Sequence, residues 1–531
     1  MKRTIITLSA GLLLLGSCTK NFKEIKDGYF GLTNEDVLQD NLAVGSSFPD
    51  MMRNVMYSPV GGEYIYQRTN SLSVDVWSGY TAWATDFGLA HANWVINADW
   101  NNHIWNNSFY NGGRIFSLWL DVKEALETYG VVDGEQQYPH FVAINNILKA
   151  FGASRVADVY GPIIYSHYGE EMTGSQFDSL QEAYNAMLVD LTNAADTLDE
   201  CLKSDVADFS GFDPVYKGDL AKWARLANTL RLRLALRIVK ADPEKAKTQA
   251  EAAINHPQGV MVKGDSYIMQ GAGRINPLYS ISVAWEDAHM NANMQSILGG
   301  YGDPRLPKFG NPVGDQVVGL RMGVDLTAPN PADYKTKLST VNVTSSADPY
   351  VVMQDAEARF LLAEAALRGW NAGGTAKEFY EAGVQMSFDD WAAGSAAGYL
   401  TSTATPADWV DPIGATKNDI AAMSDVTPTW DEALSNEQKL EKIITQKWIA
   451  GFPDGYNAWA EYRRTGYPKL FPTASNGSGG TVDSNLGFRR LPYVQSVKEN
   501  NAAGYADAAS KLGGPDDVTT RLWWDVDKGN F

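Results

Sequence analysis

The sequence predicts a mainly α-helical protein in which paired helices form a scaffold and long insertions form a second, loop-rich lobe. Several stretches of the 531 residues carry apolar side chains at helical spacing, whereas long stretches rich in Gly, Pro and Asn show no such period. We expect the scaffold at about 31–60, 112–256, 350–392 and 433–466. We expect the insertion lobe at about 61–111, 257–349, 393–432 and 467–531.

Each expected helix shows one apolar face. In one of them a 3-4-3 spacing places four residues on the same side: Phe141, Ile144, Leu148 and Phe151. Gly161-Pro162 ends that helix, and a possible capping box at Ser435 and Gln438 begins a later one. Further helices are expected at 31–57, 178–202, 219–240, 354–369, 374–391 and 456–464. Helix pairs of this size resemble tetratricopeptide units of roughly 34 residues, although the pairs show little similarity to one another.

Two charged clusters receive a structural interpretation. The helix expected at 219–240 carries four arginines: Arg225, Arg231, Arg233 and Arg237. Such a cluster could bind an anion, but no Gly-rich phosphate loop accompanies it, so we interpret the arginines as links between neighbouring helices. We interpret Asp303-Pro304-Arg305-Leu306 as a structural turn.

The start of the chain has the features of a bacterial lipoprotein signal. An apolar run from Ile5 to Leu15 is too short to span a bilayer as a mature helix, and the small pair Gly16-Ser17 then precedes Cys18. We expect a signal peptide over 1–17, acylation of Cys18 and a polar tether over 18–30. The alternative is an ordinary signal peptide with an incidental cysteine, which the position of Cys18 disfavours. Several acyl chains on one cysteine would anchor the protein stably to a membrane.

Charge and composition argue against several classes of function. Loss of Lys2 and Arg3 with the signal takes the formal net charge from −19 to −21, which argues against a nucleic-acid partner. Apart from Cys18 the chain has one cysteine, Cys201, so we expect no internal disulfide and no thiolate metal site. The six histidines show no metal-ligand spacing. We expect no cofactor and no metal, while the sequence leaves a structural calcium ion open.

The stretch from 70 to 119 combines tryptophan with short polar residues. It holds six of the sixteen tryptophans: Trp77, Trp83, Trp94, Trp100, Trp105 and Trp119. Its first part shows no clean helical or strand period, so we expect loops. Large rings among Asp and Asn suit a sugar, which offers C–H faces for stacking and hydroxyls that need hydrogen-bond partners. The alternative is a core that uses Trp, and we assign Trp100, Trp105 and Trp119 to the core.

We expect a binding site among the remaining aromatic and charged residues. The candidate ligand-binding residues are Asp75, Trp77, Tyr80, Trp83, Trp94, Trp285 and Arg321. The first four lie within nine residues and offer a stacking platform with a carboxylate, although Trp77 or Tyr80 could equally pack under the loop. Trp94 is a second platform candidate. In the other long insertion, Trp285 could form an opposing wall, and Arg321 could donate to hydroxyls or to an acidic sugar.

Five sequence motifs, in this order along the chain, resemble those of a known protein family. They are Asp158-Val-Tyr-Gly-Pro-Ile-Ile-Tyr165, Trp223–Arg237, Glu357–Gly369, Gln446–Gly455 and Trp459–Pro468. With the lipoprotein signal they are similar to the SusD/RagB outer-membrane nutrient-binding lipoproteins of Bacteroidetes, over essentially the whole mature chain. Near the C-terminus, Arg489-Arg490-Leu491-Pro492-Tyr493 resembles the family's Arg-Arg-x-x-Tyr-Pro, with Val494 where Pro is common.

This resemblance implies a scaffold of tetratricopeptide-like hairpins and a ligand site on the insertion lobe. It also implies a lipid-anchored protein on the cell surface that captures oligosaccharide or polysaccharide for a SusC-like TonB-dependent outer-membrane transporter, and that is not an enzyme. One alternative is a helical-repeat lipoprotein that binds peptide or protein. Another is a glycoside hydrolase, which needs two carboxylates roughly 5–9.5 Å apart; we recognise no such signature. Which glycan is bound does not follow from the residues.

Overall fold

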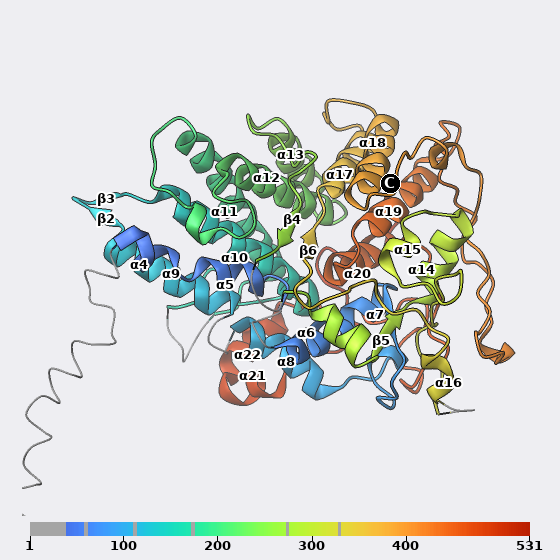
Figure 1. Ribbon diagram of the computed structural model, residues 1–531. Coiled ribbons are helices and arrows are strands. Elements are labelled where there is room, and N and C mark those ends of the chain that lie inside the picture. The colour runs from blue at the N-terminus through green and yellow to red at the C-terminus, as the bar shows by residue number, and fades with distance from the viewer. Residues whose placement is uncertain (1–38, 58–61, 110–113, 171–175, 272–274, 328–330) are drawn as a thin grey trace, which may run out of the picture.

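The structure is a computed structural model that describes residues 39–57, 62–109, 114–170, 176–271, 275–327 and 331–531. Successive long helices pack against one another in two groups (Figure 1). The first group comprises α9 (Ile115–Tyr129), α10 (Pro139–Tyr160), α11 (Leu180–Cys201), α12 (Leu220–Arg237) and α13 (Pro243–Ile254). The second comprises α17 (Ala356–Leu367), α18 (Ala376–Asp390), α19 (Asn436–Ala450) and α20 (Gly455–Thr465). The predicted mainly α fold of helix pairs is confirmed. The expected signal, tether and Cys18 lie outside the described residues.

The scaffold helices begin and end where the sequence offers caps. Before α11, the Ser179 hydroxyl accepts from the Glu182 backbone N–H, and the Glu182 carboxylate accepts from the Ser179 N–H. The capping box predicted for Ser435 and Gln438 begins α19. Helix α10 ends at Gly161, whose φ of 91° suits a residue without a side chain. These local signals explain why the long helices were predictable.

The arginines of α12 link helices, as interpreted from the sequence. Arg233 Nη2 lies 2.6 Å from Glu357 Oε2 on α17. Arg237 Nη1 lies 2.6 Å from Asp158 Oδ2 on α10. Two further pairs are Arg225–Asp265 and Arg231–Gln249. Because the first two pairs are buried, removing one partner would leave an uncompensated charge in the interior. The Arg233–Glu357 pair therefore joins the two helix groups, whereas the Arg237–Asp158 pair joins two helices of the first group.

The 303–306 turn is structural, as expected. The side chains of Arg305 and Asp303 are fully buried, and Nη2 lies 2.6 Å from Oδ2. The guanidinium also donates to Ser387 of α18 and to Gln446 of α19. This turn therefore fastens the 257–349 insertion to the second helix group.

The stretch 61–111 is more helical than predicted. Helix α6 (Glu63–Tyr66), the π-helix η2 (Gln67–Val74) and α7 (Asp75–Trp77) form one run, and α8 (Ala98–Phe109) follows. In a π-helix the backbone bonds span five residues, so the apolar side chains lose the period of 3.6 on which the prediction depended. In α8, burial of Ile104 and Trp105 outweighs the low helix propensity of an Asn-rich sequence. Irregular structure remains mainly over 78–97.

Two other segments differ from the prediction. The helix expected at 31–57 is divided, within the described part, into η1 (Gln39–Asn41), α4 (Leu42–Gly45) and α5 (Phe48–Asn54). Asp40 has a φ of 53°, which breaks a continuous α-helix. The tail after Tyr467, expected to be irregular, contains α21 (Gln495–Asn500) and α22 (Ala502–Ser510). Both are too short to show an apolar period in the sequence.

Three short antiparallel sheets occur in the described part of the chain: two join distant segments and one is a local hairpin. They are β1 (Thr81–Trp83) with β5 (Ala288–Met290), β2 (Val131–Val132) with β3 (Glu135–Gln136), and β4 (Tyr267–Met269) with β6 (Tyr350–Met353). Trp83 lies opposite Ala288, so the β1–β5 pair brings two long insertions together. The remaining elements are η3 (His91–Asn93), η4 (Ser210–Phe212), η5 (Tyr279–Ala284), α14 (Ala292–Met294), η6 (Gln295–Gly299), α15 (Leu306–Phe309), α16 (Pro331–Lys335), η7 (Tyr399–Thr401) and η8 (Thr416–Asn418).

The core uses most of the tryptophans. Trp100, Trp105 and Trp119 are buried, as assigned from the sequence. Cys201 is a free, buried thiol. Within the described ranges, no helix combines the length and apolarity needed to cross a membrane. In Figure 1, β5 and α16 lie at the lower right, and the β2–β3 hairpin lies at the far left.

Candidate functional site

Three of the predicted site residues lie in the core. Asp75, Trp77 and Tyr80 are only 2, 3 and 1% exposed. Trp77 packs on Trp459 with ring centroids 4.8 Å apart, and Tyr80 stacks on Trp448 at 5.2 Å. The expectation of an exposed platform at these positions is wrong, because the run η2–α7 packs against α20 and buries this face.

Asp75 is a buried carboxyl group. Its Oδ2 accepts from the Tyr66 hydroxyl at 3.4 Å, and its Oδ1 has no hydrogen-bond partner among the described residues. Gly455 approaches so closely that a Cβ there would lie 2.2 Å from Asp75 Oδ1. Burial, and then the charge of Asp454, raise the pKa of Asp75 to about 8. Asp75 therefore keeps its proton at neutral pH and is not the surface carboxylate that the sequence suggested.

Trp94 is buried as well. Its backbone has a φ of 58°, and its ring lies 5.1 Å from that of Phe488. Gly487 packs against the same ring, where a Cβ would come within 2.5 Å. The prediction that Trp94 is a surface platform is therefore wrong, because the C-terminal segment covers its ring.

The structure brings two predicted residues, Trp83 and Arg321, to one cavity of about 350 Å³. The cavity lies where the end of β1 and the following loop meet the segment 321–327 and Ser475. We call it the Trp83 cavity. The side chains that define it are Trp83, Phe87, Leu89, Asn93, Arg321 and Leu326. Its walls come from three parts of the chain, 82–93, 321–327 and Ser475, each separated from the next by more than a hundred residues.

One wall of the Trp83 cavity is apolar. The rings of Trp83 and Phe87 meet edge to face at 5.6 Å, and Trp100 packs against both from behind. Leu89 is 65% exposed although it is aliphatic. Trp83 itself is only 6% exposed, so the expectation that it is a surface platform is wrong as well: Trp100 and Phe87 pack on its ring. The partly exposed Phe87 ring and Leu89 supply the accessible apolar contacts, which suit the C–H face of a pyranose.

The opposite wall holds a positioned cation. Arg321 Nε donates to the Pro472 carbonyl at 3.0 Å, and Nη1 donates to the Asn418 carbonyl at 3.0 Å. These two bonds fix the guanidinium plane, and no described residue accepts from Nη2. Asn93 Nδ2 donates to the Ser475 carbonyl at 3.1 Å and so ties two walls together. The cavity is therefore lined by a guanidinium that two hydrogen bonds hold in place.

Trp285 is the predicted aromatic residue that is exposed. It is 43% exposed and lies two residues before Asp287. Asp287 Oδ1 accepts from Thr85 Oγ1 at 2.7 Å, and Thr85 lines the Trp83 cavity. Glu286 has a φ of 54°, an uncommon conformation for a residue with a side chain. The Trp285 indole is thus exposed to solvent, two residues from Asp287, which contacts the cavity residue Thr85.

Sequence reasoning missed Phe87, Leu89 and Asn93. The prediction depended on the tryptophans and did not include Phe87-Gly88-Leu89, in which two large apolar residues flank a glycine in a polar loop. Gly88 has a φ of 70°, which marks a tight turn. That pattern was the available signal for an exposed apolar loop tip.

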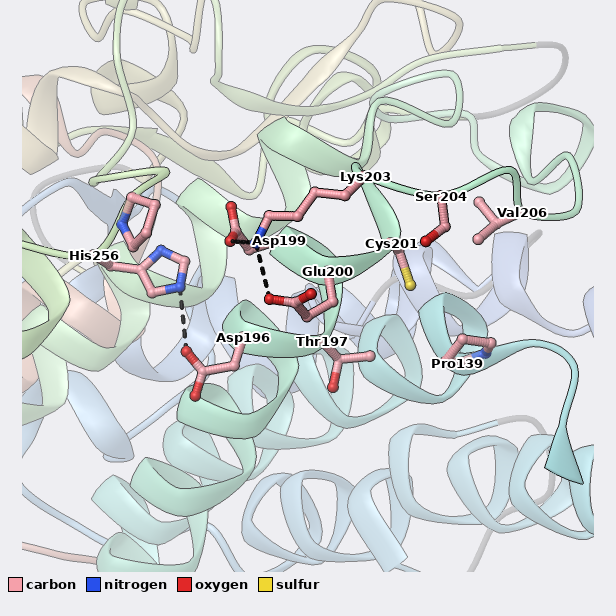
Figure 2. A pocket seen from close by; sticks show the side chains of 11 residues that line it. Pro139, Asp196, Thr197, Asp199, Glu200, Cys201, Lys203, Ser204, Val206 and His256 are labelled. Atoms are coloured by element: carbon pink, nitrogen blue, oxygen red, sulfur yellow. Dashed lines mark hydrogen bonds and ion pairs between the residues drawn. The ribbon is translucent and has the colours of Figure 1, made fainter.

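A larger hollow lies on the scaffold (Figure 2). This open cleft of about 730 Å³ lies at the C-terminal end of α11, beside Pro139 and His256. Lys203 pairs with Asp199 at 2.9 Å, and His256 lies 3.3 Å from Asp196. None of the described residues that line it is Phe, Tyr or Trp, so it lacks a stacking surface for a sugar. In the described part of the chain, no three His, Cys, Asp or Glu side chains are placed to hold a metal.

Comparison with protein families gives one match over most of the chain. A family model described as SusD-like, SusD and RagB outer membrane lipoprotein, matches residues 24–525. The chain belongs to the SusD/RagB family. Comparison with curated proteins finds no match.

Solved structures agree with this membership. A chitin-binding SusD homologue from Flavobacterium johnsoniae is 41% identical, covers 92% of this chain and 100% of its own, and superimposes with a TM-score of 0.85. A SusD homologue from Bacteroides vulgatus is 35% identical over 93% of this chain and 99% of its own, with a TM-score of 0.86. Another from Bacteroides uniformis is 36% identical over 91% and 99%, with a TM-score of 0.83.

In this SusD-family protein, residues of the motifs that resemble the family form hydrogen bonds within the scaffold. Arg490 Nη2 donates to the Tyr160 carbonyl at 2.9 Å, and the Tyr493 hydroxyl donates to the Pro162 carbonyl at 2.7 Å. These bonds join the end of α10 to the C-terminal segment. None of the four residues lines the Trp83 cavity. These motif residues therefore hold scaffold elements together and do not line the cavity.

Proposed function

We propose that this protein is a glycan-binding lipoprotein of the cell surface and that the Trp83 cavity with Trp285 is its binding site. One observation carries the proposal: the partly exposed Phe87 ring and the exposed Leu89 line the same cavity as Arg321. A volume of about 350 Å³ lies in the range of small-molecule sites. The site contacts its ligand by stacking and hydrogen bonding, and no covalent step is proposed.

The ligand class we propose is a neutral, N-acetylated glycan such as a chitin oligosaccharide. The 41% identical structure from Flavobacterium johnsoniae, which binds chitin, supports this class. In this chain Leu89 offers apolar contact to an acetyl methyl group, and Arg321 Nη2 offers a donor to an acetamide or hydroxyl oxygen.

Carboxylates in the cavity disfavour acidic sugars. Asp86 and Asp325 line it together with Arg321. Hydrogen bonds from the Thr327 hydroxyl and backbone N–H lower the pKa of Asp325, so this group stays ionised. A uronate or sulfate would meet both negative charges, whereas a neutral sugar hydroxyl can donate to them. Of the two partners suggested for Arg321 by the sequence, we therefore propose a neutral sugar.

We further propose that Cys18 carries a lipid anchor in the outer membrane and that bound glycan passes to a SusC-like TonB-dependent transporter. The family's description as outer-membrane lipoproteins and the signal-like start of the sequence support this proposal. Capture then requires binding and release of the glycan at the surface and no chemical change in it.

Isothermal titration of the purified protein with N-acetylglucosamine hexamer tests this function. We expect saturable binding by the parent protein and its loss in Leu89→Arg, because a long cationic side chain fills the mouth of the cavity. Val189→Arg, at a similarly exposed position on the scaffold helix α11, is the control and should bind like the parent. Absence of binding to this and other glycans, or release of shorter sugars during the titration, would contradict the proposal.

A further inference from the structure

The mouth of the Trp83 cavity carries two carboxylates. Asp86 and Asp325 both line the cavity and are exposed, whereas Trp83 and Leu326 are buried. The carboxylates therefore lie on the solvent side of the cavity. They come from two different walls, since Asp86 follows β1 and Asp325 belongs to the segment 321–327. A ligand that enters the cavity meets a negative charge from each wall.

Each carboxylate is held by a short turn of its own loop. Asp86 Oδ1 accepts from the Gly88 backbone N–H at 2.8 Å. Asp325 Oδ1 accepts from the backbone N–H and the hydroxyl of Thr327, at 2.9 and 2.7 Å. These bonds use one oxygen of each group, and no described residue donates to Oδ2 of Asp86 or of Asp325. Each carboxylate therefore keeps an oxygen that can accept from a ligand.

The cations around the cavity leave these carboxylates without an ion pair. Arg321 donates to two backbone carbonyls, and no described carboxylate forms an ion pair with it. Hydrogen bonds from Thr327, and to a smaller extent the charge of the exposed Lys417, lower the pKa of Asp325. The residues that line the cavity include two carboxylates and one guanidinium, so their formal charge is −1. The whole chain carries −19, and a negative cleft attracts cations.

A further carboxylate lies behind the same wall. Asp287 accepts from the cavity residue Thr85 and, through Oδ2, from Gln67 Nε2 at 2.7 Å. Both donors are neutral, so these bonds fix the carboxylate without cancelling its charge. Asp287 therefore adds to the negative potential on the β1 side of the cavity.

The cavity is also lined by a residue with an unpaired donor. The Trp83 side chain is only 6% exposed, and no described residue accepts from its indole N–H. A buried N–H without an acceptor costs free energy, which an oxygen atom of a ligand can recover. The cavity therefore combines an indole donor, a guanidinium donor and two carboxylate acceptors, a set that suits a ligand with both oxygen atoms and a cationic group.

We infer that the glycan bound here is partially deacetylated and that the ammonium group of one glucosamine residue pairs with Asp86 and Asp325. An ammonium is a cation with three donors, so it satisfies ionised carboxylates as a lysine side chain does. A neighbouring N-acetylated residue keeps the contacts proposed above for Leu89 and Arg321. The inference rests on the proposed function, which supplies the glycan, and it adds the charge of one sugar residue.

Isothermal titration at about pH 6 tests the inference with two ligands, N-acetylglucosamine hexamer and the same hexamer lacking one acetyl group. The sugar amine is protonated at this pH, because comparable α-amino groups titrate at about 7.7–8.0. We expect the deacetylated hexamer to bind about fivefold more tightly, which corresponds to about 1 kcal/mol, the upper range for exposed ion pairs. The difference should vanish at about 1 M salt, where the Debye length is about 3 Å.

Two double variants assign the preference to its carboxylates. Asp86→Asn with Asp325→Asn should lower the ratio of the two Kd values from about five to about one, because the amides keep the shape and lose the charge. Asp133→Asn with Glu135→Gln removes two exposed charges on the β2–β3 hairpin and should keep the ratio of the parent. All the substituted groups are exposed, so thermal unfolding of both variants should match that of the parent.

The remaining outcomes separate this inference from the proposed function. Equal Kd values of the parent for the two hexamers, or tighter binding of the fully acetylated one, overturn the inference and leave the glycan proposal intact. A preference that persists in the Asp86 and Asp325 variant, or that disappears in the hairpin control, overturns the assignment to these two carboxylates. Absence of binding to either hexamer overturns the proposed function and the inference together.

Discussion

Substitution of Trp285 by alanine should weaken glycan binding about eightfold without affecting the fold. Trp285 is 43% exposed, which corresponds to about 100 Å² for a side chain of about 250 Å². Stacking a sugar ring on one face covers about half of this, roughly 50 Å². At about 25 cal/mol per Å², the lost contact is worth about 1.2 kcal/mol, or about an eightfold change in Kd.

Affinity electrophoresis in gels that contain soluble glycol chitin measures this change. Tyr129→Ala provides the control, because Tyr129 is similarly exposed (49%) but ends α9, beside the β2–β3 hairpin and far from β5. Thermal unfolding of both variants should match that of the parent, since neither ring is buried. An unchanged Kd for Trp285→Ala, or equal weakening by both substitutions, would refute the assignment of Trp285 to the site.

Two further predictions concern the residues that proved to be buried. Trp77→Ala should lower the free energy of unfolding by about 3–5 kcal/mol, because it empties a packed position against Trp459; urea unfolding followed by circular dichroism measures this. A Trp77→Ala protein that is as stable as the parent but no longer binds glycan would instead show that Trp77 is an exposed ligand-binding residue. Asp75 has a folded pKa of about 8 against 3.8, so the folded state keeps a proton that the unfolded chain releases. Its contribution to stability therefore falls as pH rises from about 4 to about 8, by at most about 1.4 kcal/mol per pH unit. Asp75→Asn should flatten this part of the profile in urea unfolding at pH 5 to 8, and parallel profiles for the variant and the parent would contradict the reasoning.

The long scaffold helices were predictable because their signals are local. In α11 and α19 the cap, the apolar face and the helix end all lie within the same short stretch of sequence. The run η2–α7 was missed because π turns shift the positions of apolar residues relative to the α-helical period. In α8 it is tertiary packing of Trp100 and Trp105 that stabilises a helix of low intrinsic propensity.

The cavity proposed as the site contains two of the residues singled out from the sequence, Trp83 and Arg321, while other predicted residues lie in the core. Whether a tryptophan is exposed depends on what packs on it: Trp77 meets Trp459, which is nearly four hundred residues away in sequence. Trp285 has no aromatic neighbour among the described residues and remains open to solvent. The cavity itself arises from the pairing of β1 with β5 and from the approach of the 321–327 segment. No local pattern encodes these long-range contacts, so single residues could not be sorted into core and site from the sequence.

A crystal structure of the protein with N-acetylglucosamine hexamer would test the central claim most directly. We expect one sugar ring stacked on Trp285 and an acetamido group in the Trp83 cavity, within hydrogen-bond distance of Arg321 Nη2. A hexamer bound instead in the acidic cleft at the end of α11, or anywhere remote from both residues, would contradict it.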